Sequence, residues 1–202
     1  MTGMRTPSRP LLVIRPGGFT LLELMATITV AAVILMLAGP SLNDFMRKQR
    51  VITAVDSITS AIGQARSIAI ATNSYVTIAP VDGTNWNSGV RVFSEGQSPN
   101  GTYSATADKL LGQYDAMPGT MTVAFKSTAN IASSTSSQTS LTYAPVGYTV
   151  TTPGKVAQVN ATFIVKFVDG NPPSRGVIIN ALGRARTCDP AVDSTCVLTA
   201  TQ

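Results

Sequence analysis

A run of 20 predominantly apolar residues near the start of the chain, from Phe19 to Ala38, constrains this sequence more than any other feature. At about 1.5 Å per residue, a helix of this length would be roughly 30 Å long, which is enough to cross a bilayer core. The apolar region of a cleaved secretory signal is usually only about 7 to 15 residues long, so such a signal would be too short to account for this run. We therefore predict a transmembrane helix.

Glu23 is the only ionisable side chain between Pro16 and Asn43. The presence of this carboxylate in an apolar run needs an explanation, because a charged side chain at the centre of a bilayer costs about 3 kcal/mol or more. One interpretation is a capping box with Thr20, in which T-x-x-E satisfies free amides at the start of a helix. The other pairs Glu23 with a positive group on a neighbouring copy, such as a new α-amine at Phe19. The residues alone leave both interpretations open.

The sequence Arg15-Pro16-Gly17-Gly18, followed by FTLLELM, resembles the class III signal of type IV pilins and type II secretion pseudopilins. The resemblance implies that a prepilin peptidase cuts between Gly18 and Phe19 and N-methylates Phe19. It also implies that Glu23 helps to register subunits in a filament. Residues 1–18 would then be a cytoplasmic leader, starting at Met1 or Met4. The rest would be held in the inner membrane with its head in the periplasm, before joining a pilus filament at the cell surface.

After Pro40 the pattern becomes amphipathic, which predicts a second helical stretch over residues 41–72. Its apolar positions recur every three or four residues, at Val51, Val55, Ile58, Ile62, Ala65 and Ala69. Pro40 matches the helix-kinking proline of the pilin family, and two separate helices broken at Pro40 are the alternative. The family resemblance therefore implies an α+β pilin fold with a leader (1–18), a filament-core helix (19–40), an amphipathic continuation (41–72) and a β-rich head (73–202).

Short runs rich in β-branched and aromatic residues follow, with turn residues between them. They predict an antiparallel sheet that packs on the helix. The clearest alternation places Phe163, Val165 and Phe167 on one face. Between Ser127 and Ser140, nine of 14 residues are Ser or Thr, which indicates a mobile loop or linker. The predicted strands cover residues 75–78, 90–93, 121–125, 141–143, 163–168 and 177–182.

Cys188 and Cys196 are the only cysteines. In an oxidising periplasm we expect them to form a small disulfide loop. A two-cysteine metal site is a weak alternative, because the chain has no histidine and no second cysteine pair.

The lack of histidine also excludes His-based acid–base catalysis and Ser-His or Cys-His nucleophile pairs. The sequence contains no phosphate-binding GxxxxGK[ST], no GxGxxG after a strand and no GxSxG elbow. We therefore expect no catalytic site, no metal and no cofactor, and predict that the protein is not an enzyme.

Gly183-Arg184-Ala185-Arg186 follows an apolar run and precedes the cysteine loop. In an extended backbone, Arg184 and Arg186 would project from one face about 6.6 Å apart, which suits adjacent phosphates. Gly183 would permit a turn or the close approach of a ligand backbone. The alternative is a solvated edge strand whose arginines block edge pairing. Net charge does not decide between them, because only 12 basic and 10 acidic side chains remain after residue 18.

A terminal strand followed by GRxR, behind a prepilin signal, resembles the GspH/FimT family and, within it, the FimT minor pilins. That resemblance implies DNA binding during natural transformation, with Gly183, Arg184 and Arg186 in the motif. Arg175 and Lys166 are further candidate phosphate contacts by proximity in sequence. The implied partners are DNA, bound through its backbone, and other pilin subunits. The alternative is a minor pilin or type II secretion pseudopilin H that acts only in filament assembly.

Overall fold

The computed structural model describes residues 18–129, 139–152 and 157–198. The chain divides into two compact units, Met1–Asp44 and Phe45–Gln202. One helix, α1 (Leu21–Thr72), belongs partly to each unit and ends at the residue where the predicted helix ends. Most of the predicted leader and most of the Ser/Thr-rich stretch lie outside the described residues. Among the described residues no single helix is both long and apolar enough to cross a membrane, and Leu21–Met36 and Ser41–Thr72 have the necessary length and composition only together, as a bent pair.

The start of α1 forms one half of the capping box that was one of the two interpretations of Glu23. The Glu23 amide donates a hydrogen bond to the Thr20 hydroxyl at 3.2 Å, which satisfies one of the free N–H groups at the helix start. Every described side chain from Leu21 to Met36 is exposed. The pairing of Glu23 with a neighbouring copy stays a prediction.

In the second unit, α1 buries the face that its periodicity predicts. The six apolar positions that recur from Val51 to Ala69 are all buried. The helix ends because Asn73 adopts a left-handed conformation with φ of 49°, and the Ser74 amide bonds to the Ala69 carbonyl at 3.3 Å. This buried face forms one wall of the main core.

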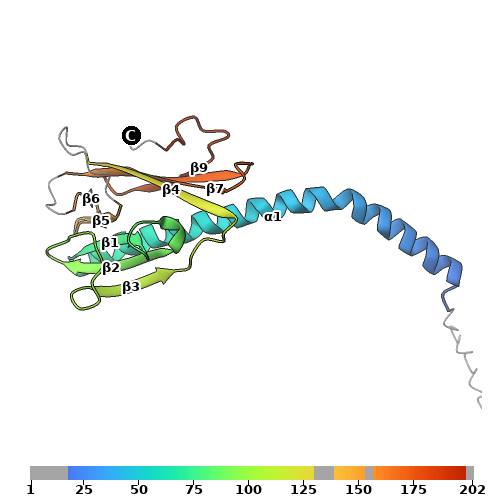
Figure 1. Ribbon diagram of the computed structural model, residues 1–202, viewed down its shortest axis with the longest axis horizontal. Helices are drawn as coiled ribbons and strands as arrows, with labels where there is room; N and C mark the ends of the chain where they lie inside the picture. Colours follow the sequence, from blue (N-terminus) through green and yellow to red (C-terminus); the bar gives the residue numbers. More distant parts are fainter. Residues whose placement is uncertain (1–17, 130–138, 153–156, 199–202) are drawn as a thin grey trace, which may run out of the picture. The chain divides into compact units, whose positions relative to one another are not determined.

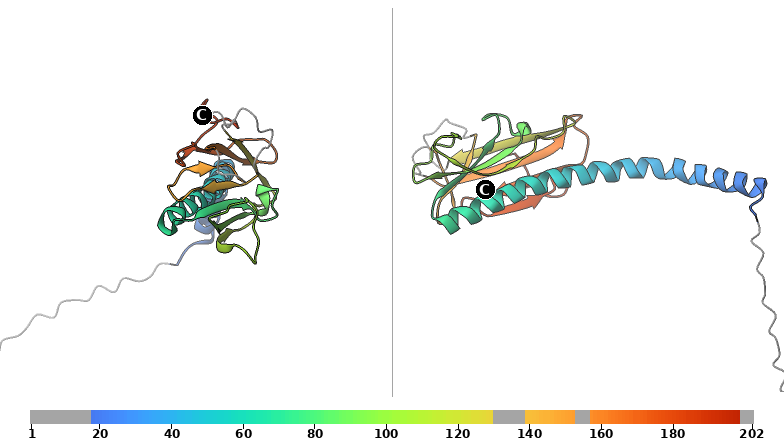
Figure 2. Two further views of the ribbon diagram at one scale, coloured as in Figure 1. Left: turned by 90° about the vertical axis from the view of Figure 1, so that its left-hand side faces the viewer. Right: turned by 90° about the horizontal axis from the view of Figure 1, so that it is seen from below.

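Two antiparallel sheets supply the rest of the core, and Figures 1 and 2 show their strands alongside the part of α1 that belongs to this unit. Within the described residues, one sheet has the order β3-β2-β1-β5-β6 and the other the order β4-β7-β8-β9. The fold is therefore α+β, as predicted. The first sheet contains β1 (Tyr75–Pro80), β2 (Val90–Gly96), β3 (Lys109–Tyr114), β5 (Leu141–Tyr143) and β6 (Thr149–Val150). The second contains β4 (Met121–Ala129), β7 (Val159–Phe167), β8 (Ser174–Ile179) and β9 (Ala185–Cys188).

The predicted alternation in β7 is confirmed. Phe163, Val165 and Phe167 are buried against the core, whereas Lys166 is exposed. Trp86, in the short 3-10 helix η1 (Trp86–Ser88), packs against the rings of both Phe125 and Phe163, with 4.7 Å between the ring centroids in each case. The six predicted strands are present, although the last ends at Ile179 rather than at residue 182. Strands β3 and β6 were not predicted, whereas β9 contains Arg186 in the extended conformation that we considered for the arginine motif.

A small cluster of buried residues, separate from the main core, covers part of the outer face of the second sheet. Cys188 and Cys196 form the predicted disulfide, which packs beside Ile178. A Cβ added at Gly176 would lie 2.7 Å from the Cys196 sulfur, so the disulfide lies directly over the backbone of β8. The loop that follows β9 is thereby fixed next to the residues of the arginine motif.

Candidate nucleic-acid interface

The turn that joins β8 to β9 positions the arginine motif. The Gly183 amide bonds to the Asn180 carbonyl at 2.8 Å, and the Asn180 amide bonds to the Arg184 carbonyl at 3.1 Å. The Asn180 side chain accepts a further bond from the Arg184 amide at 3.0 Å. Gly183 has a φ of 75°, a left-handed conformation that glycine adopts without steric cost. These contacts place Arg184 immediately before β9.

Gly183 also permits the close approach of another backbone segment, which is the Gly147 segment of this chain and not a ligand. A Cβ at this position would lie 2.3 Å from the Gly147 carbonyl oxygen and 2.8 Å from the Tyr143 ring. The Tyr143 hydroxyl donates to the Gly183 carbonyl at 3.3 Å, and burial raises the pKa of this phenol. The turn that we predicted for Gly183 is therefore present, and its close contacts are structural.

Arg184 and Arg186 line the same hollow, as their spacing predicted. This hollow has a volume of about 520 Å³ and is also lined by Ile178, Asn180 and Ala185. The side chain of Arg184 is exposed, and within the described ranges no carboxylate oxygen lies within ion-pair distance of its guanidinium. Arg184 is thus available to an anion that enters the hollow.

Arg186 differs from Arg184, because a carboxylate of this chain already pairs with its guanidinium. Its Nη1 lies 2.8 Å from Oδ2 of Asp193, and its Nη2 donates to the Thr195 hydroxyl at 2.8 Å. Its side chain is still 47% exposed. Sequence reasoning missed this pairing because Asp193 lies in the disulfide loop, whose path over the sheet only the fold establishes.

Asp193 is held in its charged form. A hydrogen bond from the Thr195 hydroxyl and then one from Arg186 lower its pKa from 3.8 to about 2. A depressed carboxyl pKa contributes stability above the unfolded value of 3.8, and that contribution is lost as the pH falls through about 2. The pair with Arg186 is therefore intact throughout the physiological pH range.

The other two predicted contacts do not join the arginines of the hollow. Arg175 pairs with Asp189 at 2.9 Å and lines a separate cavity with Ile52 and Val55 of α1, on the side of the sheet that faces the helix. Lys166 lies on the outer face, but its β8 partner Ser174 is four residues from the partner of Arg186. That offset is about 13 Å along the strand, with about 10 Å across two strands. Proximity in sequence was misleading because Arg175 points to the opposite face of the sheet and Lys166 lies on a strand that is not adjacent to β9.

Arg66 is a cation near this turn that sequence reasoning missed. Its Nε donates to the Gly147 carbonyl at 2.9 Å and its Nη2 to the Leu182 carbonyl at 3.5 Å. Both partners are neutral, so the positive charge of Arg66 remains uncompensated by them. No sequence signal links a polar position of the helix to this turn, because the contact spans more than 100 residues.

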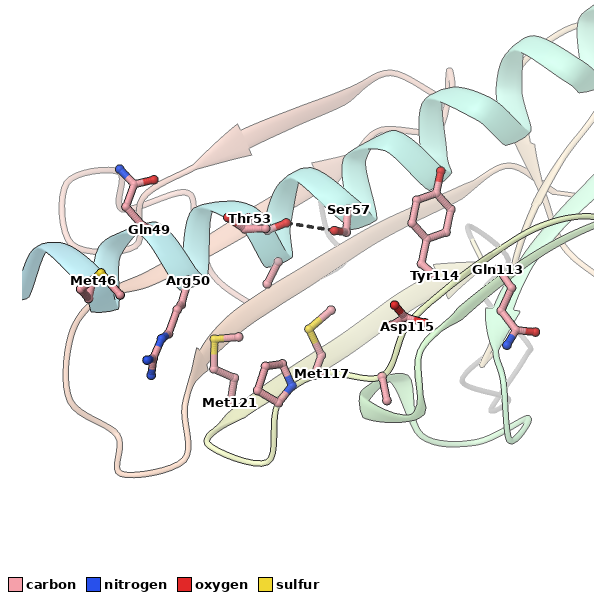
Figure 3. A pocket seen from close by; sticks show the side chains of 13 residues that line it. Met46, Gln49, Arg50, Thr53, Ser57, Gln113, Tyr114, Asp115, Met117 and Met121 are labelled. Carbon is pink, nitrogen blue, oxygen red and sulfur yellow. Dashed lines mark hydrogen bonds between the residues drawn. The ribbon is translucent and has the colours of Figure 1, made fainter. Parts of the chain in front are cut away.

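A second hollow in the head has a different chemistry. It measures about 500 Å³ between α1 and the segment from Gln113 to Met121, and Figure 3 shows Met117 and Met121 directed towards the helix. Its lining combines the apolar side chains of Met46, Met117 and Met121 with polar and charged ones, Arg50 and Asp115 among them. Among the described residues no group of three or more His, Cys, Asp or Glu side chains is arranged to hold a metal ion.

Comparison with known proteins gives matches over most of the chain. A family model described as Type II transport protein GspH matches residues 54–183, and one described as a prokaryotic N-terminal methylation motif matches residues 15–39. No curated protein matches significantly. The family match covers more than half of the chain and ends at Gly183, so Arg184 and Arg186 lie just beyond it.

Two kinds of solved structure are similar. The type IV minor pilin FimU of Pseudomonas aeruginosa has 19% identity and a TM-score of 0.51, covering 76% of this chain and 99% of that one. The minor pseudopilin EpsH from the type 2 secretion system of Vibrio cholerae has 10% identity and a TM-score of 0.47, covering 70% of this chain and 98% of that one. The similarity to FimU shows a shared fold.

Proposed function

Because this chain belongs to the GspH family of type IV minor pilins and pseudopilins, we propose that it is a minor pilin that binds extracellular DNA for natural transformation. The observation that carries the proposal is the hollow shared by Arg184 and Arg186, in which no described carboxylate neutralises Arg184. An arginine fork binds phosphate oxygens through two parallel hydrogen bonds.

The ligand that fits this surface is the phosphate backbone. On the described outer face of β7, β8 and β9 the residues are aliphatic, polar or basic, while the aromatic rings of Phe163 and Phe167 point into the core. Bases would therefore find no stacking platform there, which disfavours recognition of unpaired bases. Phosphate contacts supply affinity independent of sequence, so binding is weak per subunit and sensitive to salt.

Assembly is the second part of the proposal. The prepilin peptidase cuts between Gly18 and Phe19 and methylates Phe19, and the mature chain waits in the inner membrane as a single-pass protein. Its exposed apolar residues from Leu21 to Met36 then pack against other pilin subunits, with Glu23 setting the register. Mass spectrometry of the mature chain should find residues 19–202 plus one methyl group. A chain that still begins at Met1 or Met4 would contradict this part.

The test of DNA binding uses the full chain in a nonionic detergent and a fluorescent DNA duplex of mixed sequence. Arg184→Ala should weaken binding at least about tenfold, because a charge-assisted contact contributes about 1.5 to 3 kcal/mol. Lys48→Ala is the matched control, since Lys48 is also exposed and lies on α1 outside the hollow. Equal affinities for the two variants would refute the site.

The alternative is a minor pilin or pseudopilin H that acts only in filament assembly. The ion pair of Arg186 favours it, because it places the Asp193 carboxylate on one of the two cations that line the hollow. If the wild-type chain assembles into filaments but retains no duplex at low salt, this alternative is correct.

A further inference from the structure

Two oxygens of the disulfide loop occupy the fork of Arg186. Asp193 Oδ2 lies 2.8 Å from Nη1, and the Thr195 hydroxyl lies 2.8 Å from Nη2. A phosphodiester presents two oxygens to the same pair of nitrogens. The loop therefore places a carboxylate and a hydroxyl where a phosphate group would bind.

The loop holds these oxygens in place before any ligand arrives. Asp193 Oδ1 accepts bonds from the Thr195 amide at 2.9 Å and from its hydroxyl at 2.5 Å. The Asp193 amide bonds to the Asp189 carbonyl at 2.8 Å, and the Cys196 amide bonds to the Asp193 carbonyl at 2.9 Å. Because the Cys188–Cys196 bond closes the loop, the carboxylate stays beside Arg186.

We infer that Asp193 and Thr195 form an internal ligand of Arg186 that a phosphate can displace. Asp193 thereby determines which anions the hairpin of β8 and β9 binds. The inference rests on the proposed function. A tethered carboxylate competes at a high effective concentration, so a small free anion displaces it poorly. When one phosphate of a polyanion is bound at Arg184, its next phosphate is also tethered near Arg186. Its effective concentration there is comparable to that of the Asp193 carboxylate. The site therefore selects polyphosphate chains over single anions.

A double-mutant cycle tests this selection. Duplex affinity is measured for the full chain in a nonionic detergent, for Asp193→Asn, for Arg186→Ala and for the double variant. Asp193→Asn should tighten binding about twofold to fivefold, the range that an exposed ion pair is worth. The gain should disappear in the Arg186→Ala background, because that variant has no guanidinium at residue 186 that the loss of the Asp193 charge could free for phosphate. Inorganic phosphate should compete with the duplex at lower concentration in Asp193→Asn than in the wild type.

Asp189→Asn is the matched control, because it removes the same charge from the same loop but releases Arg175 outside the hollow. Thermal unfolding of each variant shows whether it is folded. If Asp189→Asn tightens binding as much as Asp193→Asn, or if the gain survives in Arg186→Ala, the inference is overturned while the proposed function stands. If neither the wild type nor Asp193→Asn binds the duplex, both are overturned.

Discussion

At the scale of single residues, Gly183 shows how the turn before β9 depends on one backbone conformation. Alanine at this position would have to adopt a φ of 75° and would place its Cβ 2.3 Å from the Gly147 oxygen. We expect Gly183→Ala to lower the free energy of unfolding by at least about 1 to 3 kcal/mol. Urea unfolding followed by the fluorescence of Trp86, the single tryptophan, measures the change.

Gly119→Ala is the control for this prediction. A Cβ at Gly119 meets no atom within 4 Å and its φ is not in the left-handed region. Its effect should stay within about 0.5 kcal/mol, as for most surface substitutions. If both alanine variants unfold at the same urea concentration, the turn does not need glycine at residue 183.

At the scale of elements, Arg47 connects the part of α1 that lies in the head with the end of β7, through contacts with Phe167 and Asp169. Its guanidinium lies 4.0 Å from the centre of the Phe167 ring, and its Nη2 lies 3.0 Å from Asp169 Oδ2. We expect Arg47→Ala to destabilise the head by about 0.5 to 1 kcal/mol, mainly through the lost stacking on Phe167, because an exposed ion pair contributes little. Trp86 fluorescence in urea measures this as well.

A lysine at residue 47 tests which contact matters. Arg47→Lys keeps the charge but loses the planar group, so it should recover only part of the lost stability. Lys48→Ala, one residue along the helix and exposed, should have little effect. A loss for Lys48→Ala as large as that for Arg47→Ala would show that the charge of the helix, and not the contact with Phe167, is responsible.

The helix and the strands of the core were predictable because burial leaves a periodic pattern in the sequence. Val51 to Ala69 recur at helical spacing, and Phe163, Val165 and Phe167 alternate. Strand β3 was missed because none of its six residues is fully buried at the edge of its sheet. An edge strand of this kind has no buried alternation to detect.

The candidate site was predictable only in part, for a related reason. Two arginines separated by one residue share a face of any extended strand, and they do line one hollow. Which carboxylate reaches which arginine depends on how the disulfide loop crosses the sheet. The sequence therefore could not distinguish Arg184, which no described carboxylate neutralises, from Arg186, which pairs with Asp193.

At the scale of the whole molecule, each unit presents a surface suited to a different kind of partner. The described residues of the first unit expose apolar side chains from Leu21 to Met36, which suits lipid and other pilin subunits. The second unit buries its own core and exposes the arginine hollow. The chain is thus a member of the GspH family with an N-terminal methylation motif, and its head carries the proposed binding site.

The measurement that tests this account most directly is the dependence of duplex affinity on salt, for the wild-type chain and for Arg184→Ala. Two phosphate contacts give a slope of log affinity against log salt of about −1.8, and one contact gives about −0.9. We predict the steeper slope for the wild type and the shallower one for Arg184→Ala. The same slope for both proteins, or an affinity independent of salt, would contradict phosphate binding at this hairpin.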